Sequence, residues 1–224
     1  MRNITQGGFS KCLKGRRHNP PQDTSTAKKA WRRSNKQDIR KACFKQQHGL
    51  CAYTELSLDG NELGHHLEHI APRSDYPERT FLPDNIILSI IDDVQSGNLL
   101  PHERFGGHHK SEKYSDDWFI SPFDKNCAAY FDYTLSGYVK ASTALQNDEQ
   151  VKADKTISVL NLNALYLVER RKACLQILKQ QIETEQPSGI PVLAEESLRL
   201  CEKKLPEFYS AKRQLFASYG VFQK

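Results

Sequence analysis

Apolar residues recur with the period of an α-helix in the N-terminal part of the chain, after an opening segment that has no regular period. Residues 1–27 are rich in Gly, Pro, Ser and Thr, which predicts an extended arm. Residues 27–48 have a helical composition, and Gly49 is expected to end that helix. Its expected buried positions are Trp31, Ile39, Ala42 and Cys43.

The helical period returns after Gln146. It is clearest in an apolar stripe with spacings of three, four and seven residues, formed by Leu162, Leu165, Val168, Leu175, Leu178 and Ile182. Proline and glycine at 187, 189 and 191 interrupt the pattern, and one last helix is expected over residues 192–216. Cys43, Cys174 and Cys201 stand among apolar helix positions, so we expect them in the core.

Between the helical regions, short segments bounded by turn-forming residues predict β-structure. Residues 51–72 contain turn signals at Asp59-Gly60-Asn61 and Gly64 and predict a β-hairpin. The apolar run at 86–91 suits a buried helix or strand, and residues 108–118 suit a short polar helix. A second hairpin is predicted where the runs AAYFDYT and GYVKAS flank Leu-Ser-Gly. The expected fold class is therefore α+β.

Composition excludes several classes of protein. The longest apolar run is far shorter than the roughly 20 residues of a membrane-spanning helix, and the first residues lack the apolar stretch of a signal peptide. The six cysteines include no CxxC pair, which favours reduced thiols over a disulfide framework. We therefore expect a cytoplasmic protein without a membrane partner.

The net charge of +5 is unevenly distributed along the chain. Residues 1–50 carry 13 Lys and Arg against 2 Asp and Glu, whereas residues 51–150 carry 7 against 17 and six of the eight His. A basic segment can bind phosphates, and an acidic block that also carries histidines can hold a metal ion. This distribution suits a metal-dependent phosphodiesterase, although a basic terminus can equally be a solvated surface.

The candidate chemistry lies in that acidic block. Glu68 directly precedes His69, Asn85 follows sixteen residues later, and His108, His109 and Lys110 come after a loop. This order supplies a hard oxygen ligand, an imidazole suited to general-base catalysis and further metal ligands, with Lys110 available for phosphate. In a flat strand Glu68 and His69 would point to opposite faces, so they can serve one site only at a strand end or a bulge.

In these residues the chain resembles the HNH endonucleases, and more closely the PtuB-like subgroup of Septu and retron anti-phage systems. The resemblance covers most of the chain. Its specific mark is HLEHIAPRSDYPERTFLPDNIILS, closed by GGHHK, and weaker marks are MRNITQGGFSKCL, QQHGLCAYTE, YFDYTLSGYV and LNLNALYLVERR. It implies a ββα-metal nuclease core at 48–140, a basic arm and helix at 1–47 and a helical extension at 141–224.

The resemblance also implies roles for individual residues. His69 would be the general base, Glu68 a ligand of Mg²⁺ or Mn²⁺, and Asn85 a brace for the loop between the strands. The last histidine of the motif matches His108, with His109 as the alternative, and it would complete the metal site. Contacts to nucleic acid are expected from Arg73, Arg79, Lys110 and Lys113.

The chain departs from the family at a second metal site. Many relatives bind a structural zinc ion through four cysteines, whereas here the corresponding positions are Cys51, Thr54, Ser89 and Gly106. Four thiolates cannot be assembled from these residues, so we expect no structural Zn²⁺.

The resemblance further implies a toxic effector in phage defence that is controlled by a PtuA-type ATPase and, in retrons, by a reverse transcriptase with its msDNA. DNA and a structured RNA such as tRNA both remain open as the substrate, because the chemistry acts on phosphate. The alternative from another class is a degenerate, non-catalytic HNH fold that binds nucleic acid or a partner.

Overall fold

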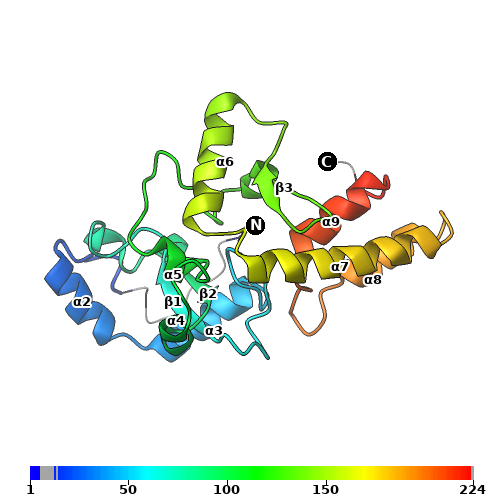
Figure 1. Cartoon of the computed structure of the whole chain (residues 1–224). Helices are drawn as coiled ribbons and strands as arrows, with labels where there is room; N and C mark the ends of the chain where they lie inside the picture. Colours follow the sequence, from blue (N-terminus) through cyan, green and yellow to red (C-terminus); the bar gives the residue numbers. More distant parts are fainter. Residues whose placement is uncertain (6–12, 14, 223–224) are drawn as a thin grey trace.

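A computed structural model describes residues 1–5, 13 and 15–222, so most of residues 6–14 in the predicted arm lie outside the described part. The fold is mixed α+β, as predicted (Figure 1). Its helices are α2 (Thr24–Arg32), α3 (Lys36–Gln46), α4 (Asp93–Asn98), α5 (Gly107–Lys110), α6 (Asn147–Val159), α7 (Leu165–Thr184), α8 (Ile190–Leu198) and α9 (Tyr209–Ser218). Its strands are β1 (His65–His69), β2 (Ile86–Ile90), β3 (Phe131–Tyr133) and β4 (Val139–Ala141).

Strands β1 and β2 form an antiparallel pair in which Glu68 lies opposite Ile87 and His69 opposite Ile86. The hairpin predicted within residues 51–72 is therefore wrong. Every residue of β2 is buried and all but Ser89 are apolar, so pairing with β2 brings β1 against a largely apolar strand. Residues 50–57 instead close a tight loop, in which the Cys51 amide donates to the Leu56 carbonyl at 2.8 Å.

The second predicted hairpin is confirmed, because β3 and β4 pair antiparallel. The single helix predicted for residues 27–48 is wrong, since α2 and α3 are separate. The Asn35 side chain starts α3 by accepting a hydrogen bond from the Asp38 amide at 3.2 Å, as an N-cap does. Gly49 follows α3 in a left-handed conformation with φ +73°, as expected for a residue that ends a helix.

Near the C-terminus, α7 agrees with the predicted apolar stripe, except that Leu165 is exposed. The last predicted helix is two helices, α8 and α9. Between them the chain turns back onto the loop after α3, where the Leu205 amide donates to the His48 carbonyl at 3.0 Å. Cys201 lies in this turn and is exposed, which contradicts its predicted place in the core. The polar helix predicted for residues 108–118 is likewise wrong beyond Lys110, where α5 ends.

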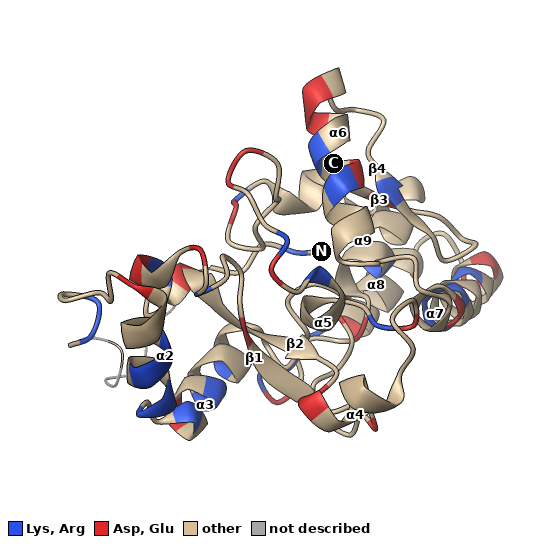
Figure 2. Cartoon of the chain, turned by 60° about the vertical axis from the view of Figure 1, so that its left-hand side comes forward, with Lys and Arg blue, Asp and Glu red and all other residues tan. Residues whose placement is uncertain are grey.

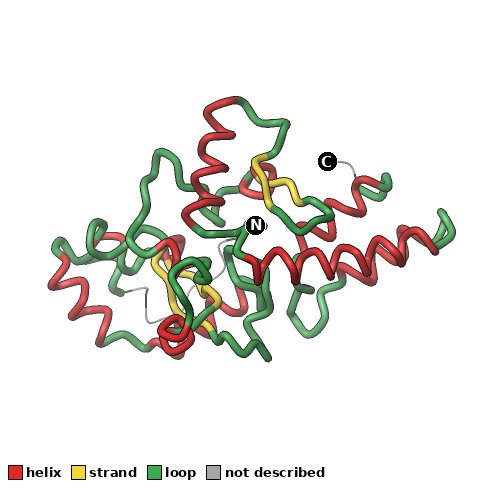
Figure 3. The backbone as a smooth tube through the Cα atoms, in the orientation of Figure 1, coloured by secondary structure: helices red, strands yellow, loops and turns green. Residues whose placement is uncertain are grey.

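One hydrophobic cluster includes residues from all three predicted parts of the chain, from Trp31 on α2 to Ala211 on α9. A smaller cluster joins the far end of α7 to α8 and α9. In Figure 3 the β1–β2 pair and helices α2 to α5 lie on one side of the molecule, and α6 to α9 with the β3–β4 pair lie on the other. Within the described part of the chain, no helix combines the length and apolarity needed to cross a membrane.

The edge of β2 is covered by side chains. The Gln47 side-chain amide donates to the Leu88 carbonyl at 2.9 Å, and its oxygen accepts from the Leu88 amide at 2.7 Å. Cys51 Sγ accepts from the Ile90 amide at 3.3 Å. These contacts satisfy backbone groups that an edge strand would otherwise leave unpaired, and they hold the strand pair that carries the predicted site.

Candidate catalytic and metal site

The predicted chemistry lies at the C-terminal end of β1, where successive side chains face different surroundings. Glu68 faces α5, together with His66 two residues earlier. His69 is the last residue of β1 and packs instead against Trp31 of α2. The two neighbouring side chains therefore face different elements, although the negative charge of Glu68 still acts to raise the pKa of His69.

Glu68 is held between two cationic or polar partners. Lys110 Nζ of α5 lies 3.0 Å from Glu68 Oε1, and His66 Nε2 lies 3.4 Å from Glu68 Oε2. Burial by itself would raise the pKa of Glu68, but the His66 hydrogen bond and the Lys110 charge together hold that pKa below its ordinary value. Glu68 is therefore an anionic carboxylate inside the protein.

His66 is fixed by its other ring nitrogen. Its Nδ1 lies 2.6 Å from the Ile91 carbonyl oxygen, which can only accept a hydrogen bond, so Nδ1 carries a proton. In the neutral ring Nε2 would then direct a lone pair at the Glu68 carboxylate, an arrangement that needs a proton or a metal cation between them. Burial lowers the pKa of His66, but hydrogen bonding and the negative charge of Glu68 outweigh it and raise the pKa above its ordinary value.

His108 lies beside this pair, with its ring centroid 4.1 Å from that of His66. Its Nε2 is buried and has no hydrogen-bond partner among the described residues; the nearest carboxylate oxygen, from Asp93, lies 3.6 Å away. His109 faces elsewhere, because its Nδ1 bonds the Val159 carbonyl at 2.9 Å. Of the two predicted histidine ligands, His108 is the one brought to Glu68.

These residues offer one carboxylate and two imidazoles to a cation. Among residues 1–5, 13 and 15–222, no three His, Cys, Asp or Glu side chains are grouped so that they could hold a metal ion as they stand. The unpartnered Nε2 of His108 and, in the neutral ring, the Nε2 lone pair of His66 nevertheless suit a divalent ion in their donor chemistry. Because the Lys110 ammonium group is paired with the Glu68 carboxylate, a metal cation would compete with it for that carboxylate.

His69 is oriented by the loop between β1 and β2. Its Nε2 lies 3.0 Å from the Thr80 carbonyl oxygen and is therefore the protonated nitrogen, while Nδ1 bonds no described residue. The ring contacts Trp31 edge-on at a centroid distance of 4.4 Å. Burial, and secondarily the charge of Arg73, lowers the pKa of His69 to about 3, so the imidazole is neutral at physiological pH.

Asn85 braces the same loop, as predicted. Its side-chain oxygen accepts from the Ala71 amide at 2.7 Å, and its nitrogen donates to the carbonyls of Ala71 at 3.1 Å and Arg79 at 3.0 Å. The residue is buried at the end of a short 3₁₀ turn (Pro83–Asn85). It joins both ends of the loop that carries Thr80 and so holds the hydrogen-bond acceptor of His69 in place.

The four predicted nucleic-acid contacts have different surroundings. Arg73 lies over the Trp31 ring, close to His69, and Lys113 is exposed. The Arg79 guanidinium is already paired with both oxygens of Asp116, at 2.7 and 2.6 Å. The Lys110 side chain is fully buried against Glu68. Arg73 and Lys113 are thus the two whose charge is available to a ligand at the surface.

Two of the positions expected to lack a structural zinc ion accept hydrogen bonds from nearby backbone amides. Ser89 Oγ accepts from the Gly107 amide at 3.0 Å, and Thr54 Oγ1 accepts from the Leu56 amide at 3.3 Å. Gly106 has φ +64°, and a Cβ atom there would stand only 2.7 Å from Ser89 Oγ. Close packing of this kind connects β2 directly to the start of α5.

Sequence reasoning missed His66 and Trp31 as members of the site. Alternation along a strand could have identified His66, because residues i and i+2 share a face and His66 stands two positions before Glu68. No local signal could have placed Trp31 beside His69, since they are far apart in the sequence.

A scan against protein-family models finds no model that matches the chain, and a search of the curated proteins finds no match.

Proposed function

We propose that this protein is a metal-dependent endonuclease of the HNH type, which hydrolyses phosphodiester bonds in nucleic acid. The observation that carries the proposal is the setting of His69. Its Nε2–H is engaged by the Thr80 carbonyl, its Nδ1 is left with a lone pair, and Asn85 holds the loop that fixes this orientation. The proposal is also supported by the order of elements, in which the β1–β2 pair is followed by α4 and then by the short helix α5 beside Glu68.

His69 acts as the general base in this mechanism. Nδ1 accepts a proton from a water molecule, whose oxygen attacks phosphorus while the bond to the leaving ester oxygen breaks. A general base works best when its pKa is near the working pH, and the pKa of His69 is low mainly because of burial and secondarily because of the positive charge of Arg73. An anionic phosphate beside Arg73 offsets that charge and makes His69 more basic when substrate is bound.

Glu68, His66 and His108 would hold the divalent ion, Mg²⁺ or Mn²⁺. When bound, such an ion neutralises charge that develops on the phosphate oxygens and the leaving group. The neighbouring protein groups hold this region in shape, since Gly107 packs directly against Glu68 and His66. We expect no structural Zn²⁺.

By the same sequence resemblance, we propose that the protein is a cytoplasmic effector of phage defence, controlled by a PtuA-type ATPase and, in a retron, by a reverse transcriptase and its msDNA. The substrate is DNA or a structured RNA such as tRNA. The site offers no reader of the ribose 2′-hydroxyl, so its chemistry is compatible with both.

The test is cleavage of labelled DNA and RNA by the purified chain with Mg²⁺, Mn²⁺ or EDTA. We expect metal-dependent cleavage that His69→Ala abolishes. His102→Ala, at an exposed histidine outside the site, should retain full activity. Cleavage that persists in His69→Ala at an unchanged melting temperature would falsify the proposed mechanism. A wild-type chain that binds but never cleaves, also when expressed with its ATPase partner, would instead indicate a non-catalytic binding module.

A further inference from the structure

Two cations share one aromatic ring next to the proposed base. Lys36 Nζ lies 4.5 Å from the centroid of the Trp31 ring, and Arg73 Cζ lies 5.4 Å from it. The same ring touches His69 at 4.4 Å. The ring and its two cations come from different elements, because Trp31 is on α2, Lys36 begins α3 and Arg73 follows β1.

Among the described residues, no carboxylate lies within ion-pair distance of Lys36 or Arg73, although both side chains are partly buried. The negative charge of Glu68 acts on Arg73 only from a longer distance. Burial lowers the pKa of Lys36, and the positive charges of Arg73, Arg16 and Arg40 lower it further. Like charges gathered without a directly paired carboxylate repel one another, and a bound anion would relieve that repulsion.

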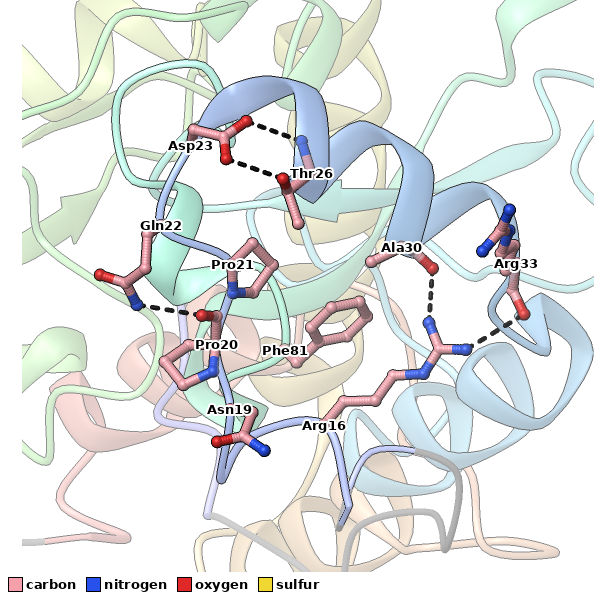
Figure 4. A pocket seen from close by; sticks show the side chains of 10 residues that line it. All are labelled: Arg16, Asn19, Pro20, Pro21, Gln22, Asp23, Thr26, Ala30, Arg33 and Phe81. Carbon is pink, nitrogen blue, oxygen red and sulfur yellow. Dashed lines mark hydrogen bonds between the residues drawn. The ribbon is translucent and has the colours of Figure 1, made fainter.

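Arg16 is close to this group but is already engaged. Its guanidinium donates to the carbonyl of Ala30 and to Ser34 Oγ, and it lies over the ring of Phe81 at 5.2 Å. Figure 4 shows it along one side of a cavity of about 490 Å³ between α2 and the preceding segment. Lys36 also donates to the Trp31 and Ser34 carbonyls, but Arg73 makes no hydrogen bond to a described residue. Arg73 therefore has its full set of donors available.

We propose that Lys36 and Arg73, held on the Trp31 ring, form a binding site for a backbone phosphate of the nucleic-acid strand that enters beside His69. The inference rests on the proposed function for the position of that strand. A guanidinium fork and an ammonium group on one aromatic ring suit a phosphate, which accepts hydrogen bonds from several directions. The site positions the strand; it does not take part in the bond-breaking step.

The surface around this cation pair fits a polyanion better than a single small anion. Figure 2 shows Lys and Arg in blue along both α2 and α3. The further exposed cations on these helices and in the turn between them are Lys28, Lys29, Arg32, Arg33, Arg40, Lys41 and Lys45. Neighbouring phosphates of one strand can contact these side chains in turn. Each such contact releases counter-ions, so binding should depend steeply on salt.

The experiment measures binding without cleavage. In a His69→Ala background with EDTA, fluorescence anisotropy of labelled single-stranded DNA, duplex DNA and RNA gives the affinity at several salt concentrations. We expect Lys36→Gln/Arg73→Gln to weaken binding about tenfold and to lower the salt slope by about 0.7 to 0.9, as the loss of one phosphate contact requires. The three probes distinguish which nucleic acid supplies the phosphate.

The matched control is Lys41→Gln/Lys45→Gln, which removes the same charge from exposed positions of α3. It should weaken binding less, and Lys36→Arg/Arg73→Lys should restore most of the affinity. An equal loss in the control overturns the inference, because only net charge would then matter. Since Lys36 also bonds the backbone, the single variant Arg73→Gln repeats the test if the double variant melts early.

Failure of this inference differs from failure of the proposed function. Equal binding by the double variant and its parent in EDTA overturns the phosphate site, even if the wild-type chain cleaves with metal. Absence of any cleavage by the wild-type chain contradicts the nuclease proposal, whatever the binding assay reports.

Discussion

The ammonium group of Lys110 lies 3.0 Å from Oε1 of Glu68, and the lysine side chain is fully buried. A buried lysine needs a compensating anion, and a buried carboxylate needs a compensating cation. Lys110 therefore serves as an internal counter-ion at the carboxylate that we propose as a metal ligand. The proposed metal ligand, Glu68 on β1, thus lies beside a group that competes with the metal for it, Lys110 on α5.

Lys110→Met removes this competitor while keeping an unbranched apolar stem. Breaking a buried ion pair by removing one partner leaves an uncompensated charge, so we expect the free energy of unfolding to fall by about 3 kcal/mol. Added Mn²⁺ should restore much of this loss by taking the place of the ammonium group. The measurement is the melting temperature with and without Mn²⁺, compared with Lys113→Met at an exposed position. If Mn²⁺ raises the melting temperatures of the wild type, Lys110→Met and Lys113→Met by the same amount, Glu68 is not its ligand.

The Asn85 side chain makes three hydrogen bonds to backbone groups of the loop between β1 and β2, so its removal should affect both stability and activity. Asn85→Ala leaves the buried Ala71 amide and the Ala71 carbonyl without a partner, while the Arg79 carbonyl keeps its hydrogen bond from the Leu82 amide. We expect this loss to cost about 2 to 4 kcal/mol in unfolding free energy. The Thr80 carbonyl should then lose its position and cleavage should fall with it. Urea unfolding and cleavage rates measure the two effects.

Asn85→Asp is the informative companion variant. Its carboxylate can still accept from the Ala71 amide, but it cannot donate to the Ala71 and Arg79 carbonyls. Its stability should lie between those of the wild type and Asn85→Ala. An Asn85→Ala variant that is fully stable would show that other groups fix the loop.

The elements that sequence reasoning predicted correctly depend on local patterns. The buried part of the predicted stripe, from Val168 to Ile182, defines α7 because its period is that of one helix face, and the aromatic runs around Leu-Ser-Gly define the β3–β4 hairpin. The brace by Asn85 also agrees with the role that the sequence resemblance implied. These features require only neighbouring residues or a motif of fixed order.

The incorrect predictions concern competition between distant segments. β1 pairs with β2 because the partner strand is buried and largely apolar, which no turn signal near Gly64 could reveal. The helix expected at 27–48 is divided by the Asn35 cap, whose effect outweighed a favourable composition. Trp31 reaches His69 only through the packing of α2 against the loop after β1, so the site's aromatic wall was not predictable from spacing.

Arg79 and Asp116 provide a pH-dependent test of a surface ion pair. Hydrogen bonds from Arg79 and Tyr114 lower the pKa of Asp116 from 3.8 to about 2. A carboxyl group whose pKa is lowered by folding stabilises the protein above its ordinary pKa, and the contribution disappears as the pH falls through the folded value. Asp116→Asn should therefore destabilise the protein at pH 7, by up to about 1 kcal/mol, and have no effect near pH 2.

Urea unfolding of Asp116→Asn and the wild type at pH 7 and pH 2 measures the stability effect. A nucleic-acid binding assay tests whether Arg79, when paired with Asp116, is available to a ligand. Because both guanidinium nitrogens of Arg79 are engaged by Asp116, Arg79→Gln should weaken nucleic-acid binding far less than Arg73→Gln does. A difference between Asp116→Asn and wild type that is as large at pH 2 as at pH 7 would mean that packing, and not the ion pair, is responsible.

Gly107 gives the sharpest steric test of the proposed metal site. A Cβ atom at this position would stand 2.8 Å from His66 Nε2 and 2.9 Å from Glu68 Oε2, so Gly107→Ala must displace one of these two groups. Gly97→Ala is the matched control, because nothing lies within 4 Å of the added atom and α4 should gain about 0.5 to 1 kcal/mol. We expect Gly107→Ala to lose metal-dependent cleavage at a nearly unchanged melting temperature and Gly97→Ala to keep it. Full activity in Gly107→Ala would mean that the geometry of His66 and Glu68 does not govern catalysis.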